Sequence, residues 1–145
     1  MSNAASFFTE NQKGRITQAI TDAELNTSGE IRVHLENHCR EDVLDRAAYL
    51  FDKLDMKKTE MRNAVLFYVA VKDRKFAILG DSGINSLVEE NFWQEVKDIL
   101  LTHFKNGDFT EGLEAGISKA GEKLKKHFPY QTDDMNELSN EITFE

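Results

Sequence analysis

The chain has 145 residues, which is enough for one domain with a core of its own and too few for two. A composition of 40% hydrophobic and 30% charged residues fits a globular protein, and no apolar run approaches the roughly 20 residues that span a bilayer. The net charge of −8 argues against nucleic acid as a partner and suits cations. A single cysteine, Cys39, excludes an internal disulfide.

The two ends of the chain differ in character. The first residues lack a basic region followed by an apolar stretch, so we expect no secretory signal, no membrane segment and a cytoplasmic protein. Residues 130–145 contain acidic side chains and neither Lys nor Arg. We therefore expect one domain over residues 1–129 and an acidic C-terminal tail over residues 130–145. Ile142 and Phe144 indicate a short edge strand within this tail.

A helix is predicted over residues 9–26. Thr9 and Gln12 have the spacing of a capping box, in which each side chain bonds a free backbone amide of the first turn. Apolar residues then recur at intervals of three and four, which gives the helix one apolar stripe. These residues are Phe8, Ile16, Ala19, Ile20 and Ala23.

Residues 30–38 alternate apolar and polar side chains, which predicts a strand with one buried face. Four residues along a strand span about 13 Å, so His34 and His38 are too far apart to share a metal ion. We interpret both as surface histidines. Residues 41–54 have an apolar stripe and open on two acids, which favours an amphipathic helix. A right-handed crossover through this helix makes the strand at 30–38 parallel to the next strand.

The most apolar stretch lies at residues 64–71 and is typical of a strand buried on both faces. Residues 72–75 are charged and residues 76–79 are apolar again, so the two apolar runs predict a β-hairpin whose second strand returns antiparallel. Ser86 and Glu89 have capping-box spacing and predict the start of a long helix, and a last helix is expected from Asp108 to about His127. This order predicts a three-layer α/β/α sandwich, with a small mixed sheet and helices on both faces.

The hairpin brings polar residues from distant positions to one end of the sheet. Carboxylate, amide and hydroxyl oxygens are the ligands of Ca²⁺ and Mg²⁺, and calcium accepts irregular arrangements of them. The candidate metal ligands at this end are Asp81, Glu30, Asn63 and Ser82. A turn that needs glycine at positions 80 and 83, with Asp81 bonding nearby amides, would give the same pattern, and this alternative stays open.

A second group of acidic residues is predicted at the opposite end of the sheet. Most of its members open helices or lie in turns, so an ion site there would be weak. The group consists of Glu36, Glu41, Asp42, Asp73, Asp108 and Glu111. The sequence has no EF-hand loop, no glycine-rich nucleotide motif and no G-x-S-x-G nucleophile. Catalytic residues therefore stay unknown.

Four stretches together resemble the TPM domain family. They begin at Ser28, Asn63, Lys75 and Phe104 and read SGEIRV, NAVLFYVA, KFAILGDSGI and FKNGDFTEGLEAGI, and the resemblance covers about residues 26–129. The family includes thylakoid-lumen photosystem-repair proteins and bacterial proteins described as phosphatases. The resemblance implies an α/β/α fold, a divalent-cation site near the glycine–aspartate turn and acid phosphatase activity in some members. By position it assigns that site to Glu30, Asn63 and Asp81, then Ser82.

Three functions follow as hypotheses. The first is a non-catalytic domain that binds Ca²⁺ or Mg²⁺ near residues 80–83. The second is a metal-assisted acid phosphatase, in which the ion polarises a phosphomonoester and Arg62 neutralises phosphate charge. The sequence shows no nucleophile or acid–base pair for that reaction, so whether the chain is an enzyme stays open. The third is an interaction domain whose acidic tail binds a protein partner.

Overall fold

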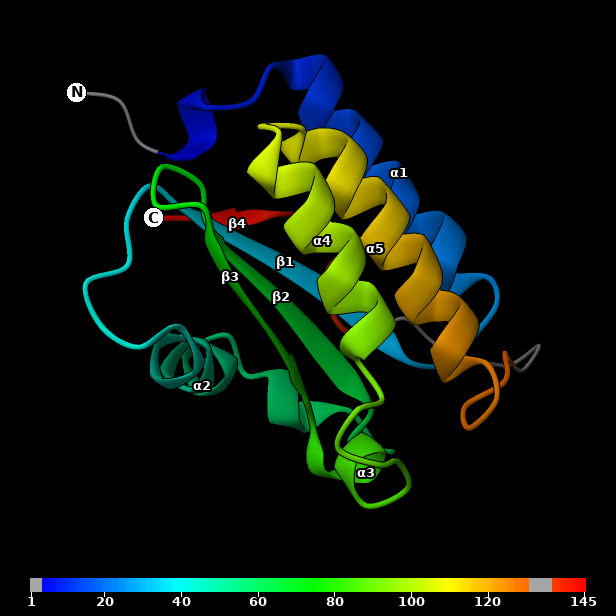
Figure 1. The fold of residues 1–145 in the computed structure, drawn as a ribbon. Coiled ribbons are helices and arrows are strands. Elements are labelled where there is room, and N and C mark those ends of the chain that lie inside the picture. The colour runs from blue at the N-terminus through cyan, green and yellow to red at the C-terminus, as the bar shows by residue number, and fades with distance from the viewer. Residues whose placement is uncertain (1–3, 131–136) are drawn as a thin grey trace.

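The computed structural model describes residues 4–130 and 137–145. Its centre is a mixed four-stranded sheet in the order β3-β2-β1-β4 (Figure 1). β1 (Glu30–Glu36) and β2 (Ala64–Ala70) are parallel, and β3 (Lys75–Gly80) runs antiparallel to β2. β4 (Thr143–Phe144) runs parallel to β1. The predicted mixed sheet, the parallel pair and the hairpin are confirmed.

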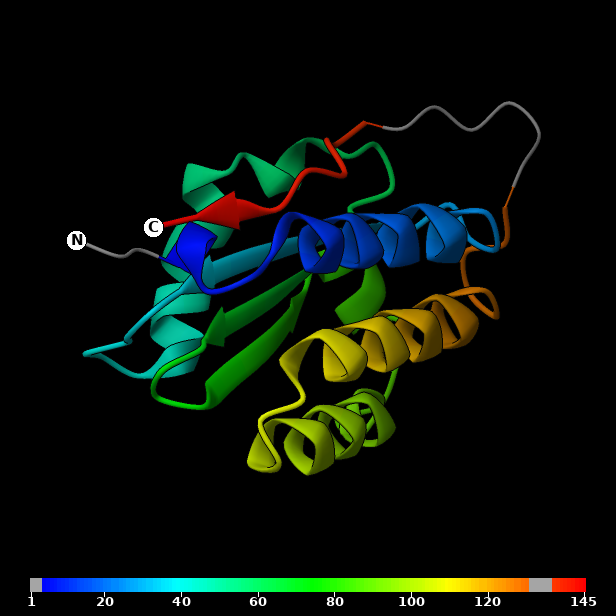
Figure 2. The same cartoon turned by 90° about the horizontal axis from the view of Figure 1, so that it is seen from above.

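Helices cover both faces of the sheet. One face carries α1 (Glu10–Glu24), α5 (Phe109–Leu124) and α4 (Gln94–Lys105), which Figure 2 shows in this order from the β4 side to the β3 side. The other face carries α2 (Val43–Lys53). Short helical turns lie at Ala4–Ser6, at Met56–Lys58 and at α3 (Ser82–Asn85). Among the described residues, no helix has the length and apolar content needed to cross a membrane.

β2 separates two hydrophobic cores, because all seven of its residues are buried. Its odd-numbered side chains, such as Phe67, pack in the larger core with α1, α4 and α5. Its even-numbered side chains, such as Leu66 and Tyr68, pack in the smaller core with α2. A strand buried on both faces reads as a continuous apolar run, so the prediction for this stretch is confirmed.

The helix starts were predicted with mixed success. The capping box at the start of α1 is confirmed, because Thr9 and Gln12 bond each other's backbone N–H at 2.8 and 3.1 Å. The predicted long helix from Ser86 is wrong, because α4 begins at Gln94. The backbone N–H of Ser86 donates to the carbonyl of Ser82, so Ser86 ends the short helix α3.

The C-terminal tail packs on the domain along its described residues. β4 confirms the predicted edge strand and pairs with β1 at His34 and Leu35. Leu138 is buried in the smaller core, and its backbone N–H donates to Glu30 Oε1 at 2.6 Å. Residues 137–145 therefore cover the outer edge of β1 instead of extending away from the domain.

Leu138 tests how much this packing stabilises the fold. We expect Leu138→Ala to lower the free energy of unfolding by about 2–3 kcal/mol, because it removes buried methyl groups and leaves a cavity. Leu87, which is 56% exposed, offers a matched control, and Leu87→Ala should change stability by less than about 0.5 kcal/mol. Equal effects of the two substitutions in urea unfolding would show that the tail does not pack as described.

Candidate functional site

The structure places the four predicted ligands at one end of the sheet, where β1 and β2 begin and β3 ends. The strand register pairs Glu30 with Ala64 and Val65 with Gly80. Asp81 directly follows Gly80 and Asn63 directly precedes Ala64, so both lie close to the level of Glu30 along the strands. Because β2 lies between β1 and β3, two strand spacings separate Glu30 from Asp81 by roughly 10 Å. The ligands therefore share one end of the sheet without forming one cluster.

Asp81 is buried, and its carboxylate is paired with Arg62. The guanidinium donates from Nε to Oδ2 at 2.7 Å and from Nη2 to Oδ1 at 2.8 Å. Oδ1 also accepts the backbone N–H of Ser82 at 2.7 Å, which caps α3. The Arg62 side chain is 41% exposed, whereas that of Asp81 is 4% exposed. The carboxylate is thus fixed in place, and the arginine can move into solvent.

Two loops cross next to Asp81. The backbone N–H of Gly83 donates to the carbonyl of Arg62 at 2.9 Å. A Cβ atom at Gly83 would lie 2.1 Å from the carbonyl oxygen of Met61 and 2.5 Å from that of Arg62, so only glycine allows this close approach. The crossing brings backbone oxygens beside the Asp81 carboxylate and the Ser82 hydroxyl. A cavity of about 310 Å³ adjoins this crossing and is lined by Arg62, Asp81 and Ser82 and by the α2 residues Phe51 and Asp52.

Glu30 is buried at the same end but bonds the tail. Its Oε1 accepts the N–H of Leu138, and its Oε2 is buried with no hydrogen-bond partner among the described residues. Burial raises the pKa of Glu30 to about 7, with a further contribution from the charge of Glu137. Burial also raises the pKa of Glu24 to about 7, helped by the charge of Glu30 and opposed by the bond from the N–H of Ile31. Two carboxyl groups near the start of β1 therefore hold protons more tightly than usual.

Asn63 lies between these two arrangements. Its backbone carbonyl accepts the N–H of Glu30 at 3.3 Å, and its side-chain Nδ2 lies 3.5 Å from Ser28 Oγ. The Asn63 side chain is thus linked to the loop before β1, and its backbone to the start of that strand.

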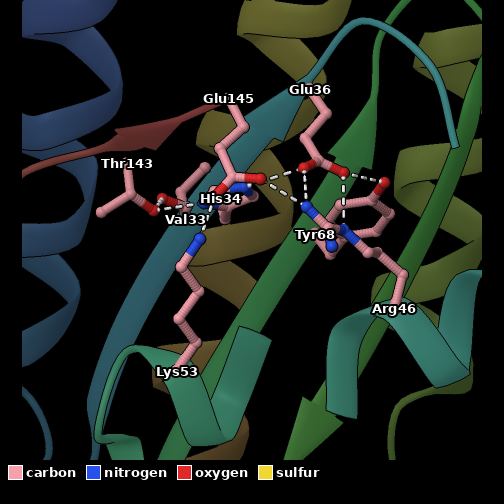
Figure 3. Close-up of polar contacts among 8 residues, drawn as sticks. All are labelled: Val33, His34, Glu36, Arg46, Lys53, Tyr68, Thr143 and Glu145. Carbon is pink, nitrogen blue, oxygen red and sulfur yellow. Dashed lines mark hydrogen bonds and ion pairs between the residues drawn. The ribbon is translucent and has the colours of Figure 1, made fainter. Parts of the chain in front are cut away.

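A second group of possible ligands lies on the α2 face, near the far end of β1 (Figure 3). One ligand atom each from His34, Glu36 and Glu145 lies within 4.8 Å of the others, so this group could hold a metal ion. His34 and Glu36 come from β1, and Glu145 follows β4. The prediction that His34 lies on the surface is wrong, because the tail covers it and leaves it 2% exposed.

Basic side chains already compensate the carboxylates of this group. Arg46 of α2 donates to both Glu36 and Glu145, and Lys53 donates to Glu145 at 2.6 Å. Burial would raise the pKa of Glu36, but the hydrogen bonds from Arg46 and Tyr68 outweigh it and hold that pKa well below its usual value. Burial lowers the pKa of His34, so its ring is neutral at pH 7. A metal ion at this group would have to displace Arg46.

One member of this second group, Glu36, was predicted from the sequence, and the other two were not. Glu36 was among the acidic residues predicted at this end of the sheet. The period-two alternation of β1 also placed His34 and Glu36 on one face, which was the available signal. Glu145 is more than 100 residues away, and no local pattern connects it to them.

A comparison with protein-family models matches the TPM domain to residues 1–123. The chain belongs to the TPM domain family. Among solved structures, this TPM domain is similar to the NMR structure of the BA42 protein from the psychrophilic bacterium Bizionia argentinensis, with 48% identity, 99% of both chains covered and a TM-score of 0.91. The N-terminal domain of the cg2496 protein from Corynebacterium glutamicum shares the fold, with 11% identity, 90% of this chain and 81% of that chain covered and a TM-score of 0.61. A search of curated proteins gives no match.

The raised pKa of Glu30 makes the stability of this TPM domain depend on pH. The folded domain binds a proton that the unfolded chain releases above pH 4.5, so this contribution to stability is complete below pH 4.5 and is lost as pH rises through about 7. We therefore expect Glu30→Gln to raise the melting temperature at pH 8 by a few degrees and to have little effect at pH 5. The exposed Glu90→Gln is the control, and an effect of Glu30→Gln equal at both pH values would contradict the assignment.

Arg46 should be far more important to stability than a surface arginine or lysine. Arg46→Gln would leave the buried Glu36 without its counter-charge, and we expect a loss of about 3 kcal/mol. Lys57, paired with Asp52 on the surface at 2.8 Å, is the control, and Lys57→Gln should cost less than about 1 kcal/mol.

The same variant tests the ligand set of the second group. With Arg46 removed, a histidine nitrogen and two carboxylates suit Zn²⁺. Added Zn²⁺ should raise the melting temperature of Arg46→Gln more than that of the unchanged domain. Equal responses would show that His34, Glu36 and Glu145 are not a metal-ligand set.

Proposed function

We propose that this TPM domain binds a divalent cation, Ca²⁺ or Mg²⁺, at the sheet end beside Asp81, and that it acts as a binding domain without catalysis. The observation that supports this most is the buried Asp81 carboxylate, which is paired, among the residues that the structure describes, with one partly exposed guanidinium. An entering ion can take over the charge that Arg62 now supplies. The displaced side chain then gains hydration, so the exchange costs little.

The donor types around Asp81 suit a hard cation. The crossing of the two loops places the carbonyl oxygens of Met61 and Arg62 against Gly83, two residues after Asp81, and Ser82 follows Asp81 with a hydroxyl. These are neutral oxygens around one carboxylate, which is a set that Ca²⁺ accepts and that Mg²⁺ can supplement with water. Asp81 is the principal ligand in this proposal, with Ser82 beside it.

Asn63 and Glu30 take part at a greater distance. Asn63 follows Arg62 directly and immediately precedes β2, so its side chain can reach the same end of the sheet. Glu30 lies two strands from Asp81, so one ion cannot contact both carboxylates as they lie. We therefore expect Glu30 to contribute charge or a water-mediated contact.

Ion binding should be visible as stabilisation. An ion at about 100 times its dissociation constant adds roughly 2.7 kcal/mol if it binds only the folded domain. We expect millimolar Ca²⁺ or Mg²⁺ to raise the melting temperature of the unchanged domain, and Asp81→Asn to abolish this rise. Arg62→Gln should strengthen the response because it removes the internal competitor, and Glu30→Gln should weaken it less than Asp81→Asn does.

Asp73→Asn is the matched control, since Asp73 bonds His38 at the opposite end of the domain. If Asp81→Asn and Asp73→Asn respond to Ca²⁺ as the unchanged domain does, the site is elsewhere. Hydrolysis of a generic phosphomonoester that is lost in Asp81→Asn and retained in Asp73→Asn would instead favour the phosphatase hypothesis.

A further inference from the structure

β3 forms an outer edge of the sheet, and its backbone is open to pairing. It is the first strand in the order β3-β2-β1-β4, with β2 on one side only. The backbone N–H of Asp81 donates to Ala64, which lies directly opposite it, so the residues of β3 that bond β2 are the odd-numbered ones. The N–H and C=O groups of Phe76, Ile78 and Gly80 therefore point away from β2.

Only part of this edge is occupied. Asn85 Nδ2 donates to the carbonyl of Gly80 at 3.0 Å. For Phe76 and Ile78, no hydrogen bond on the outer side is found within the part of the chain that the structure describes. The unoccupied section of the edge is thus centred on Ala77.

Exposed apolar side chains flank this section on the α4 face. Phe104 of α4 packs against Phe76, with 5.6 Å between the ring centroids, while Leu100 and His103 contact glycines of α5. With 100° between successive helix residues, Leu101 falls next to the sheet-facing side of α4 and away from α5. Leu101 is 59% exposed, and Figure 2 shows α4 on the β3 side of the helical layer. We infer from this position on the helix that its side chain is directed toward the outer edge of β3.

The α2 face offers a matching residue. Arg46 and Lys53 of α2 point toward β1 and the tail, whereas Ala48 lines the cavity beside Leu79 of β3. Leu44 lies one turn before Ala48 and shares its side of the helix. It is 54% exposed. The open edge thus lies between an exposed leucine on each face.

We propose that this edge is the interface of a reversible homodimer, in which β3 pairs antiparallel with β3 of a second copy about a two-fold axis near Ala77. Phe76 of each copy then exchanges backbone hydrogen bonds with Ile78 of the other, and the bond from Asn85 to Gly80 is kept. The leucines at positions 44 and 101 of each copy cover the new strand pair. A two-fold pair of identical edges is self-complementary, as closed dimers require.

The charges at the two ends of β3 favour a second copy over an unrelated strand. The hairpin link and the first residue of β3 carry Lys72, Arg74 and Lys75 against one acid, Asp73. The segment after β3, residues 81–90, carries acids and no basic residue. About an axis at Ala77, position 74 of one copy lies opposite position 80 of the other, so the basic link of one copy lies beside the segment that leads to Glu89 and Glu90 of the other. Asp81 faces Asp73 of the other copy and is already paired with Arg62, so it adds no attraction. The overall charge of −8 opposes association, so we expect a weak dimer that forms at high concentration.

Sedimentation equilibrium up to about 1 mM protein tests the proposal. We expect the mean mass to rise from 16.6 kDa toward twice that value, and Leu101→Glu or Leu44→Glu to weaken association at least about tenfold. Leu25→Glu is the control, because Leu25 is 63% exposed at the end of α1, on the β4 side of the helical layer. Circular dichroism melts confirm that each variant is folded.

Amide hydrogen exchange at two concentrations identifies the edge directly. The N–H groups of Phe76 and Ile78 should exchange rapidly in dilute solution and more slowly at 1 mM, while the N–H of Ala77, which bonds β2, should not change. A mass that stays at 16.6 kDa, or a dimer that Leu101→Glu and Leu44→Glu leave intact, overturns the proposal. Slow exchange of Phe76 and Ile78 at both concentrations also overturns it, because the edge would then be closed within one copy.

Discussion

The position of β2 between a parallel and an antiparallel neighbour is the constraint on which the polar sites depend. It makes the beginnings of β1 and β2 and the end of β3 meet at one side of the sheet. It also fixes which face each side chain occupies, because a slip of one residue would turn every side chain of a strand to the other face. Tyr68 can bond Glu36 only because both alternate onto the α2 face. The burial of all seven β2 residues holds this register.

At both ends of the sheet an arginine compensates a buried carboxylate, and the two arginines differ in how many bonds hold them. Arg46 bonds two carboxylates and has a side chain that is 21% exposed. Within residues 4–130 and 137–145, the Arg62 side chain bonds Asp81 alone, and it is 41% exposed. Removing Arg46 exposes two negative charges to each other, whereas moving Arg62 leaves one carboxylate that an ion can satisfy. The group of Glu36 and Glu145 therefore joins the tail to α2 and β1, and the Asp81 carboxylate is the one that we propose exchanges its arginine for a dissolved cation.

The sequence predicted what depends on local periodicity and missed what depends on distant contacts. The apolar run of β2, the alternation of β1 and the capping box at Thr9 each act within a few residues, so the fold class and strand directions could be predicted. The burial of His34 depends on Thr143 and Glu145, and the pairing of Arg62 with Asp81 depends on how two loops cross. The predicted start of α4 was wrong for a related reason. Serine is a common first residue of a helix, but Ser86 is the C-terminal cap of α3.

The two edges of the sheet also differ in how they are protected. The outer edge of β1 is covered by residues from the far end of the chain, with Glu145 N–H bonding the carbonyl of Leu35 and Leu138 buried in the smaller core. β3 has no such cover among the described residues, and its protection is limited to the exposed Lys75 at one end and the bond from Asn85 at the other. Exposed strand edges with apolar flanks tend to aggregate by adding further strands, unless the unpaired part of the edge is short. Here the charged link and the Asn85 bond confine pairing to the centre of the strand, so a two-fold pair uses up the free groups and association stops at the dimer.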